Sequence, residues 1–424
     1  MKKSAKCFMS FFLAAVMVFS IVGCSSQGAK SANQKVTLNA LFMKQAGYSE
    51  DDVNAMTSEF EKANPNIKVN LTYVAYEELE PKILTAAKSG GYDVILGDCI
   101  WPAQFAQAGM VLDLTSKVSK LDLKDIYKGA LDSVTYKGKY YGLPWLNDVK
   151  YLYYNKKMLS DAGFTSPPKT WDELMTQAKA IKAKGLVQYP IAWSWSQAEC
   201  LICDYTAIAG SFGGKFVDSS NNPTLSTTAN KNALDFMYNS LKDGTTNPKS
   251  LEMIEDDVLS TFVSGDAAFA LNWTYMYNAA QDPTKSKVVG EVGVTAIPGT
   301  PGVTSATVNG GMPLMITKGS KYPDQSWKYM LYISSKGVQT KYAKSALPIW
   351  KSLYSDPAVV STNPDMVAAS KIQYNYIVNR PQVPYYSELS TNMQSEIQNV
   401  LLGKETSQAA LDTLQAKAKQ LANQ

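Results

Sequence analysis

Two aspartates stand next to tryptophans at positions suited to holding a solute. Asp98 closes the stretch "YDVILGD" (92–98), and Trp101 follows it by three residues. Asp148 comes directly after "YGLPWLN", in which Trp145 precedes it by three residues. A fixed carboxylate accepts hydrogen bonds from hydroxyl groups, and a flat aromatic ring packs against C–H groups. The two clusters therefore have the chemistry of a site for a hydroxyl-rich molecule.

Each aspartate also has a structural interpretation. Asn147 and Asp148 form an Asn-Asp pair, which favours turns. Asp98 precedes "CIWPAQF", where it would cap the N-terminus of a helix. We predict that both carboxylates contact a ligand, and the turn and the cap remain the alternatives.

Two further aromatic pairs have a spacing of two residues. Trp193 and Trp195 flank Ser194, and Trp273 and Tyr275 flank Thr274. In a strand, residues two apart share one face. Each pair would then line a pocket together or pack together in the core.

Arg380 is the only arginine among the 41 basic residues of the chain. Its planar guanidinium binds a carboxylate or a hydroxylated ligand in a way that lysine cannot. The sequence leaves two roles open for it, namely ligand binding and the clamping of a structural carboxylate.

Histidine is absent from the chain. This excludes Ser-His-Asp hydrolysis, Cys-His catalysis and the common zinc sites. Cys200 and Cys203 form a CxxC motif that would suit a redox or metal pair, but a lone motif of this kind is more typical of two small buried residues or a structural bridge. The acidic stretch 252–258 has the pattern of a solvated helix start rather than a catalytic pair. We expect no cofactor and no metal site.

The N-terminus has the pattern of an export signal. Three lysines precede an almost wholly apolar run that closes on "IVGC", and this resembles the lipobox of bacterial lipoproteins. We predict a signal peptide over 1–23, a lipidated Cys24 and a flexible tether over 24–35, which would anchor the protein to the outer face of the cell membrane. A plain secretory signal with an incidental Cys24 is the alternative. No later segment is long and apolar enough to form a transmembrane helix.

The remaining chain of about 400 residues is long enough for two domains. Its bases and acids nearly balance after the signal is removed, so no nucleic-acid surface is expected. Strand and helix patterns alternate from residue 36 onward, including a helix over 49–65 that opens on Ser49 and a strand over 67–74, which predicts a parallel sheet with helices on both faces. Ligands bind beyond the carboxyl ends of such strands, where Asp98 stands.

A second alternating block follows Asp148. The residues from Asp148 to Asn155 alternate strictly and carry aromatics on both sides, so this strand is either covered on both faces or lines a cavity with one of them. We predict a helix over 170–185 with a capping box of Thr170 and Glu173, and a strand over 267–276.

Several segments resemble family 1 of the extracellular solute-binding proteins, the sugar-capturing lipoproteins of ATP-driven importers. Their order and spacing carry the resemblance: "FEKANPNIKV" (60–69), 93–115, 136–181, "FVSGDAAFALNWTY" (262–275), 309–333 and 379–411.

This resemblance implies an α/β periplasmic-binding-protein-like fold (type II-like). Two α/β lobes, joined by crossing hinge strands, would close on a ligand in the cleft between them, and membrane permease subunits would dock on the closed form. The lobes are predicted as 36–147 plus about 292–345, and 148–291 plus about 346–424. A monomer is expected.

The resemblance also implies ligand contacts at Asp98, Asp148, Trp273, Tyr275, Gly310, Gly311 and Arg380. The chain departs from its relatives at Met312 and Leu146, where they often have aromatics. A stacking platform would then be missing or come from Trp145, Trp193 or Trp195.

We therefore predict a carbohydrate-binding protein without catalysis, whose ligand is an oligosaccharide. One alternative is a surface-anchored glycoside hydrolase that uses Asp98 and Asp148. Against it, the sequence shows no acid in an apolar setting that would raise the pKa of a general acid. The other alternative keeps the fold and changes the ligand to a polyamine or a phosphate ester.

Overall fold

The computed structural model describes residues 35–424, apart from the side chains of residues 88 and 89. The predicted signal peptide, the lipidated Cys24 and most of the tether lie outside these residues. In the described part of the chain, no helix is long and apolar enough to cross a membrane.

The first sheet contains five strands in the order β2 (Ile67–Val74), β1 (Val36–Met43), β3 (Val94–Leu96), β12 (Met312–Ile316) and β6 (Leu143–Leu146). The strands β2, β1 and β3 are parallel, as the alternating pattern predicts. The late strand β12 enters antiparallel to both β3 and β6. The sheet is therefore mixed, because its last strands come from a return passage of the chain.

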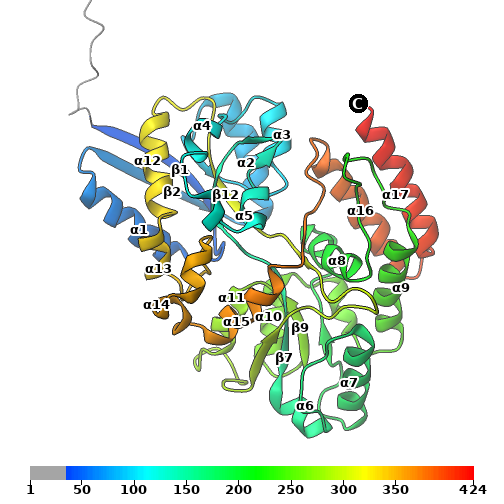
Figure 1. Ribbon diagram of the computed structural model, residues 1–424. Coiled ribbons are helices and arrows are strands. Elements are labelled where there is room, and N and C mark those ends of the chain that lie inside the picture. Colours follow the sequence, from blue (N-terminus) through cyan, green and yellow to red (C-terminus); the bar gives the residue numbers. More distant parts are fainter. Residues whose placement is uncertain (1–34) are drawn as a thin grey trace, which may run out of the picture. The chain divides into compact units, whose positions relative to one another are not determined.

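Helices cover this sheet and share one apolar core with it (Figure 1). Helix α1 begins where sequence predicts, since the Ser49 hydroxyl accepts from the Asp52 amide and the Asp52 carboxylate accepts from the Ser49 amide. This helix spans Glu50–Ala63, and the others in this core are α2 (Tyr76–Ser89), α3 (Pro102–Gln107), α4 (Thr115–Val118), α12 (Pro323–Ile333) and α13 (Lys336–Lys341). Helix α5 (Lys128–Asp132) contacts β6 but packs Ala130 into the cluster of Tyr151 and Tyr153. A short hairpin of β4 (Thr135–Tyr136) and β5 (Lys139–Tyr140) lies between α5 and β6 in the chain.

The second sheet contains four strands in the order β10 (Val292–Thr295), β7 (Tyr151–Asn155), β9 (Phe269–Asn272) and β8 (Ile191–Ala192). Strand β7 is covered on both faces. Leu152 packs in one apolar cluster, and Tyr151 and Tyr153 pack in another. The aromatics of this strand thus belong to packing, which is the first of the two options that its alternation allows.

The helices around the second sheet fall into two groups according to these clusters. One group packs with Leu152 and comprises α6 (Lys156–Ala162), α7 (Trp171–Ala183), α8 (Glu199–Ser211), α9 (Thr228–Lys242), α16 (Tyr386–Leu401) and α17 (Ser407–Ala422). The other packs with Tyr151 and comprises α10 (Glu255–Val263), α11 (Tyr275–Ala280), α14 (Pro357–Val360) and α15 (Pro364–Gln373).

Two passages of the chain connect the sheets and pair with each other. One runs from β6 to β7 through Asp148, and the other runs from β10 through β11 (Thr307–Val308) to β12. Val149 and Asn309 form a β-bridge, and the Gly310 amide donates to the Asp148 carbonyl at 2.9 Å. Strand β11 also pairs with β13 (Ile377–Val378), which ends two residues before Arg380. These pairings hold Asp148, Gly310 and Arg380 in one region.

Three details differ from the sequence predictions. The predicted strand 267–276 ends at Asn272, because Thr274 already has helical dihedrals and Tyr275 starts α11. The Glu173 carboxylate accepts from the amide of Lys169 rather than that of Thr170, although Thr170 caps α7. Strand β10 pairs with the second sheet, whereas the proposed boundary near 292 assigned it to the first lobe. The lobe boundaries remain a prediction.

Candidate functional site

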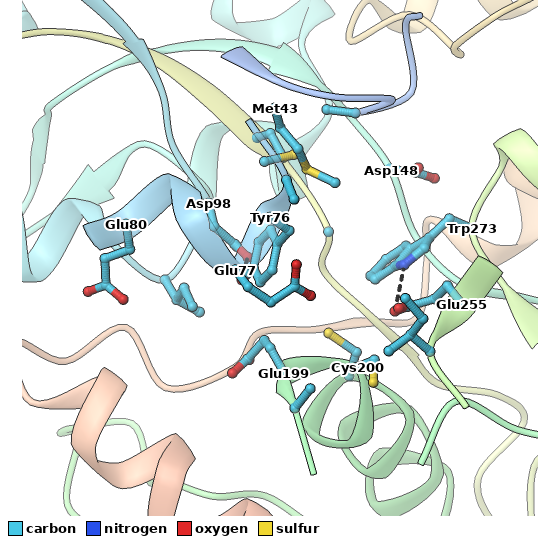
Figure 2. Close-up of a pocket in the computed structure, with 18 of the residues that line it drawn as sticks. Met43, Tyr76, Glu77, Glu80, Asp98, Asp148, Glu199, Cys200, Glu255 and Trp273 are labelled. Atoms are coloured by element: carbon cyan, nitrogen blue, oxygen red, sulfur yellow. Dashed lines mark hydrogen bonds between the residues drawn. The ribbon is translucent and has the colours of Figure 1, made fainter. Parts of the chain in front are cut away.

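A cavity of about 800 Å³ contains most of the predicted site residues (Figure 2). Seven of them line it: Asp98, Trp101, Asp148, Trp273, Tyr275, Gly310 and Arg380. Asp98 follows β3 of the first sheet, and Trp273 follows β9 of the second. Residues at the ends of strands from both sheets therefore face one cavity.

Four predicted residues do not line this cavity. Trp145 is buried in the first core, where its ring lies 5.4 Å from that of Phe42. Trp193 and Trp195 are stacked on each other at 5.5 Å within the core of the second sheet. Gly311 packs against Ser133, where an added Cβ would lie 2.9 Å from the Ser133 Cβ. The structure places the three tryptophans and this glycine in packing.

Asp148 uses only one of its two carboxylate oxygens within the protein. Its Oδ1 accepts from the amides of Val149 at 2.9 Å and Thr274 at 3.2 Å, and also from the Thr274 hydroxyl. These bonds fix the carboxylate and explain why Thr274 leaves the strand conformation. Oδ2 has no hydrogen-bond partner among residues 35–424 and is available to a ligand.

Burial raises the pKa of Asp148 to about 6, against the opposing effect of the hydrogen bonds from Thr274. The sequence argument that no acid has a raised pKa was therefore wrong. The hydrolase alternative needs Asp98 as its second carboxylate. Both oxygens of Asp98 already have partners within the protein, so Asp98 differs from Asp148, which has a free oxygen.

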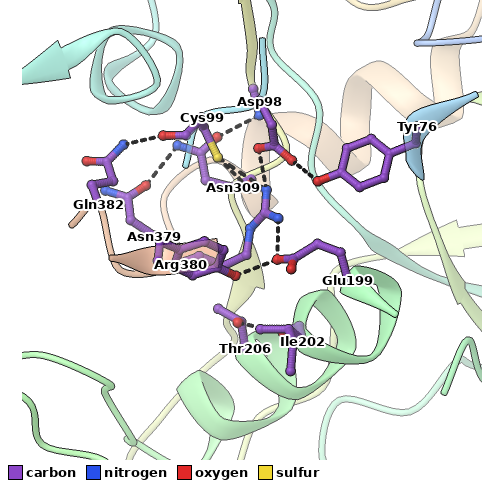
Figure 3. A network of polar contacts seen from close by, with 12 residues as sticks. Tyr76, Asp98, Cys99, Glu199, Ile202, Thr206, Asn309, Asn379, Arg380 and Gln382 are labelled. Carbon is purple, nitrogen blue, oxygen red and sulfur yellow. Dashed lines mark hydrogen bonds and ion pairs between the residues drawn. The ribbon is translucent and has the colours of Figure 1, made fainter. Parts of the chain in front are cut away.

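Arg380 binds carboxylates that come from different elements (Figure 3). Its Nη2 lies 2.7 Å from Oδ1 of Asp98, and its Nη1 lies 2.7 Å from Oε1 of Glu199 at the start of α8. The Tyr76 hydroxyl donates to the other oxygen of Asp98 at 2.7 Å. Arg380 is only 2 % exposed. It clamps two carboxylates and also lines the cavity, so the structure supports its structural role directly.

The carboxylates of this cluster have hydroxyl partners as well. Glu199 accepts from the hydroxyls of Tyr386 and Ser390. Burial raises the pKa of Glu199, and Arg380 opposes that shift. The interpretation of Asp98 as a helix cap was wrong, since Trp101 occupies the N-cap of α3 and Asp98 is bound to Arg380.

The indole of Trp273 is held by a buried ionic cluster. Its Nε1 donates to Oε1 of Glu255 at 3.1 Å, and Lys150 Nζ lies 5.0 Å from the ring centroid. Lys150 is fully buried and pairs with both Asp204 at 2.6 Å and Glu255 at 3.1 Å. Burial lowers the pKa of Lys150, but these two carboxylates outweigh it and raise the pKa overall. The lysine therefore stays charged and fixes the ring.

Gly310 is required by the same indole. A Cβ at this position would lie 2.3 Å from Cζ3 of Trp273, closer than any side chain tolerates. The glycine-rich turn therefore lets the backbone of the return passage approach the aromatic platform.

Two further aromatics complete the wall. Tyr76 stacks on Trp101, with ring centroids 5.9 Å apart and planes 18° apart. Tyr275 donates its hydroxyl to Asp256 at 2.9 Å. Platforms for C–H faces thus stand on both sides of the cavity.

The three cysteines among residues 35–424 do not form a bridge. Cys99, Cys200 and Cys203 are free thiols, and the last two lie one turn apart on α8 at the cavity wall. Burial raises the pKa of Cys200 to about 12, which makes a reactive thiolate unfavourable. Within residues 35–424, no group of three or more His, Cys, Asp or Glu side chains is arranged to hold a metal ion.

Sequence reasoning missed many residues of the wall, among them Tyr76, Glu77, Glu199 and Glu255. A signal existed for Glu199, because a single buried arginine requires carboxylate partners. Glu255 was assigned to a solvated helix start, and α10 does begin there, but its side chain turns inward to Lys150 and Trp273.

The family model of the bacterial extracellular solute-binding proteins matches residues 32–340. A probable ABC transporter-binding protein of Deinococcus radiodurans is 29% identical, over 78% of this chain and 80% of that protein.

Solved structures show the same fold. The maltose-bound MalE3 of T. maritima superposes with a TM-score of 0.83 at 28% identity, covering 91% of this chain and 100% of that one. A solute-binding protein of Agrobacterium radiobacter K84 in complex with ribitol gives a TM-score of 0.79 at 26% identity, covering 92% of this chain and 99% of that one.

Proposed function

The chain belongs to the bacterial extracellular solute-binding protein family, and we propose that it captures a carbohydrate, an oligosaccharide in particular, for an ABC importer. The family consists of solute-binding proteins rather than enzymes, and its name places its members outside the cytoplasm. We propose that this protein acts as a monomer, without catalysis, and delivers its ligand to membrane permease subunits.

The observation that carries the proposal is the pairing of Asp148 with Trp273 in one cavity. A carboxylate oxygen without a protein partner faces the same space as a rigid indole. A sugar offers hydroxyl donors to the first and a C–H face to the second. A volume of about 800 Å³ lies in the range of cavities that enclose a ligand larger than one small ring. Maltose and ribitol in the two related structures agree with this class of ligand.

The proposal predicts that an oligosaccharide binds and stabilises the protein. Titration with a panel of mono- and oligosaccharides should change the tryptophan emission, because Trp101 and Trp273 line the cavity, and should raise the melting temperature. Trp273→Ala should weaken binding by about ten- to a hundredfold, since stacking and closure are lost together. Trp327→Ala, a change in helix α12 away from the cavity, is the control.

Two results would contradict this function. If no member of the panel shifts either signal, the ligand is not a carbohydrate. If the bound oligosaccharide is recovered shortened after long incubation, the protein is a hydrolase, and Asp148→Asn should then abolish the cleavage.

We further propose that Cys24 carries a lipid anchor, which rests on the sequence pattern alone. Cells that express the full chain should retain it in the membrane fraction and label it with a palmitate analogue. Cys24→Ser should remove the label and release the protein. Retention and labelling of the Cys24→Ser protein would contradict the assignment.

A further inference from the structure

Acidic residues outnumber basic ones in the cavity wall. Eight acidic residues line it, against only Lys44 and Arg380. Arg380 already pairs with Asp98 and Glu199, so it has no charge to offer an anionic ligand. Lys44 is exposed to solvent. The wall therefore carries a net negative charge.

The buried lysine behind the wall does not compensate for this charge. Lys150 is shared between Asp204 and Glu255, so each buried cation here serves two carboxylates. The other five acids of the wall form no ion pair within residues 35–424: Glu50, Glu77, Glu80, Asp148 and Asp256. Enclosing these charges around a neutral ligand would remove water from them without providing a counter-charge.

Glu77 and Asp148 are the carboxylates with the most capacity for a ligand. Figure 2 shows the Glu77 carboxylate reaching into the open middle of the cavity, toward the side that holds Trp273. Glu77 is exposed and has no hydrogen-bond partner among the described residues. Asp148 keeps Oδ2 for a ligand, because its protein partners all bind Oδ1.

The chemistry of the wall separates possible cations. A tight metal site needs several ligands converging on one point, and no such group exists in the described part of the chain. Carboxylates spread around a wide cavity with aromatic walls suit an organic cation, whose N–H groups form charge-assisted hydrogen bonds. The same charge disfavours a phosphate ester.

We propose that the solute is a carbohydrate bearing a protonated amine, that is, an amino sugar or amino polyol. This inference rests on the proposed function, since it specifies the ligand class of the same cavity. The amine is held by Glu77 and Asp148, while the C–H faces of the ligand pack on the aromatic wall.

Calorimetric titration of the protein with matched pairs tests the inference. Glucosamine disaccharide is compared with its N-acetylated form and with cellobiose, glucamine with glucitol, and spermidine serves as an amine without a sugar. The amino member should bind at least about tenfold more tightly than its neutral partner. This preference should shrink at about 1 M salt, where screening acts over about 3 Å.

Glu77→Gln keeps the side-chain shape and removes one charge, so it should reduce the amine preference by about tenfold. Glu78→Gln is the matched control, because Glu78 is an exposed neighbour on α2 that does not line the cavity. It should leave the preference unchanged.

The outcomes separate the two proposals. If neutral members bind as tightly as amino members in every pair, the inference is overturned and the carbohydrate function stands. If no carbohydrate binds, with or without an amine, the proposed function fails. It also fails if spermidine is the one compound of the panel that binds. Equal effects of Glu77→Gln and Glu78→Gln would overturn the placement of the amine.

Discussion

Replacing Arg380 with methionine is expected to lower the free energy of unfolding by about 3–5 kcal/mol. The guanidinium is 2 % exposed and neutralises two carboxylates, those of Asp98 and Glu199. Methionine fills a similar volume but leaves both carboxylates buried without a counter-charge. The loss is measured by urea denaturation at neutral pH.

Lys117→Met serves as the control for this loss. Lys117 pairs with Asp324 at 2.9 Å, but the Asp324 side chain is 84% exposed. An ion pair of this kind contributes about 0–1 kcal/mol. If the two variants lose equal stability, Arg380 does not clamp the cluster. Arg380→Lys should restore little, since one ammonium group cannot bridge two carboxylates in the planar geometry of Arg380.

The Arg380 cluster also joins elements that belong to the two sheets. Asp98 follows β3 of the first sheet, whereas Glu199 starts α8, which packs with the second. A ligand that binds Asp98 competes for a carboxylate that already holds Arg380. If the ligand uses Asp98, occupancy of the cavity and the strength of this clamp are coupled.

Much of the fold followed from local patterns. The strand at 67–74 and the capped start of α1 agree with the sequence prediction, because alternation and capping are read from neighbouring residues. The prediction failed at 267–276 because the bend at Thr274 depends on Asp148, which is 126 residues away. Secondary-structure propensities along the chain carry no information about that long-range contact.

The candidate site also has residues that could be predicted from the sequence and residues that could not. Asp98 was expected at the cavity because the ends of parallel strands meet at one edge of a sheet, whereas Asp148 and Trp273 were expected there from the family resemblance; all three line it. Trp193 and Trp195 have the same residue type and spacing as cavity aromatics, yet they stack in the core. Burial depends on which helix covers that face, and the amphipathic pattern of the covering helices does not specify it. Glu255 was missed because its role requires Lys150, a partner that is distant in the sequence.

The second large effect is expected at Asp148, where asparagine should weaken ligand binding while making the free protein more stable. Asparagine can still accept from Thr274, but it places an amide donor at the position of Oδ2, the oxygen that is free to accept from a ligand. The loss of a charge-assisted acceptor should reduce affinity by about ten- to a hundredfold. Titration of both proteins with the same oligosaccharide measures this loss.

The gain in stability follows from the raised pKa. Burial raises the pKa of Asp148 from its ordinary value of 3.8 to about 6, so the folded protein holds this proton more tightly than the unfolded chain does. The stability gained from the bound proton is fully present below pH 3.8 and is lost as pH rises through 6. Asparagine never ionises, so Asp148→Asn should be more stable than the native protein by about 1–3 kcal/mol at pH 8. The difference should vanish near pH 4.

An acid with the opposite shift provides the control. Asp218 lies in an exposed turn, where the side chain of Asn222 lowers its pKa, so Asp218→Asn should reduce stability at pH 8 and leave affinity unchanged. Destabilisation of Asp148→Asn at pH 8 would contradict the assignment of a costly buried charge. Unchanged affinity would remove Asp148 from the binding site. If Asp148→Asn is more stable and also binds more weakly, the charge of Asp148 serves the ligand and not the fold. This is the property expected of a residue retained for binding at a cost in stability.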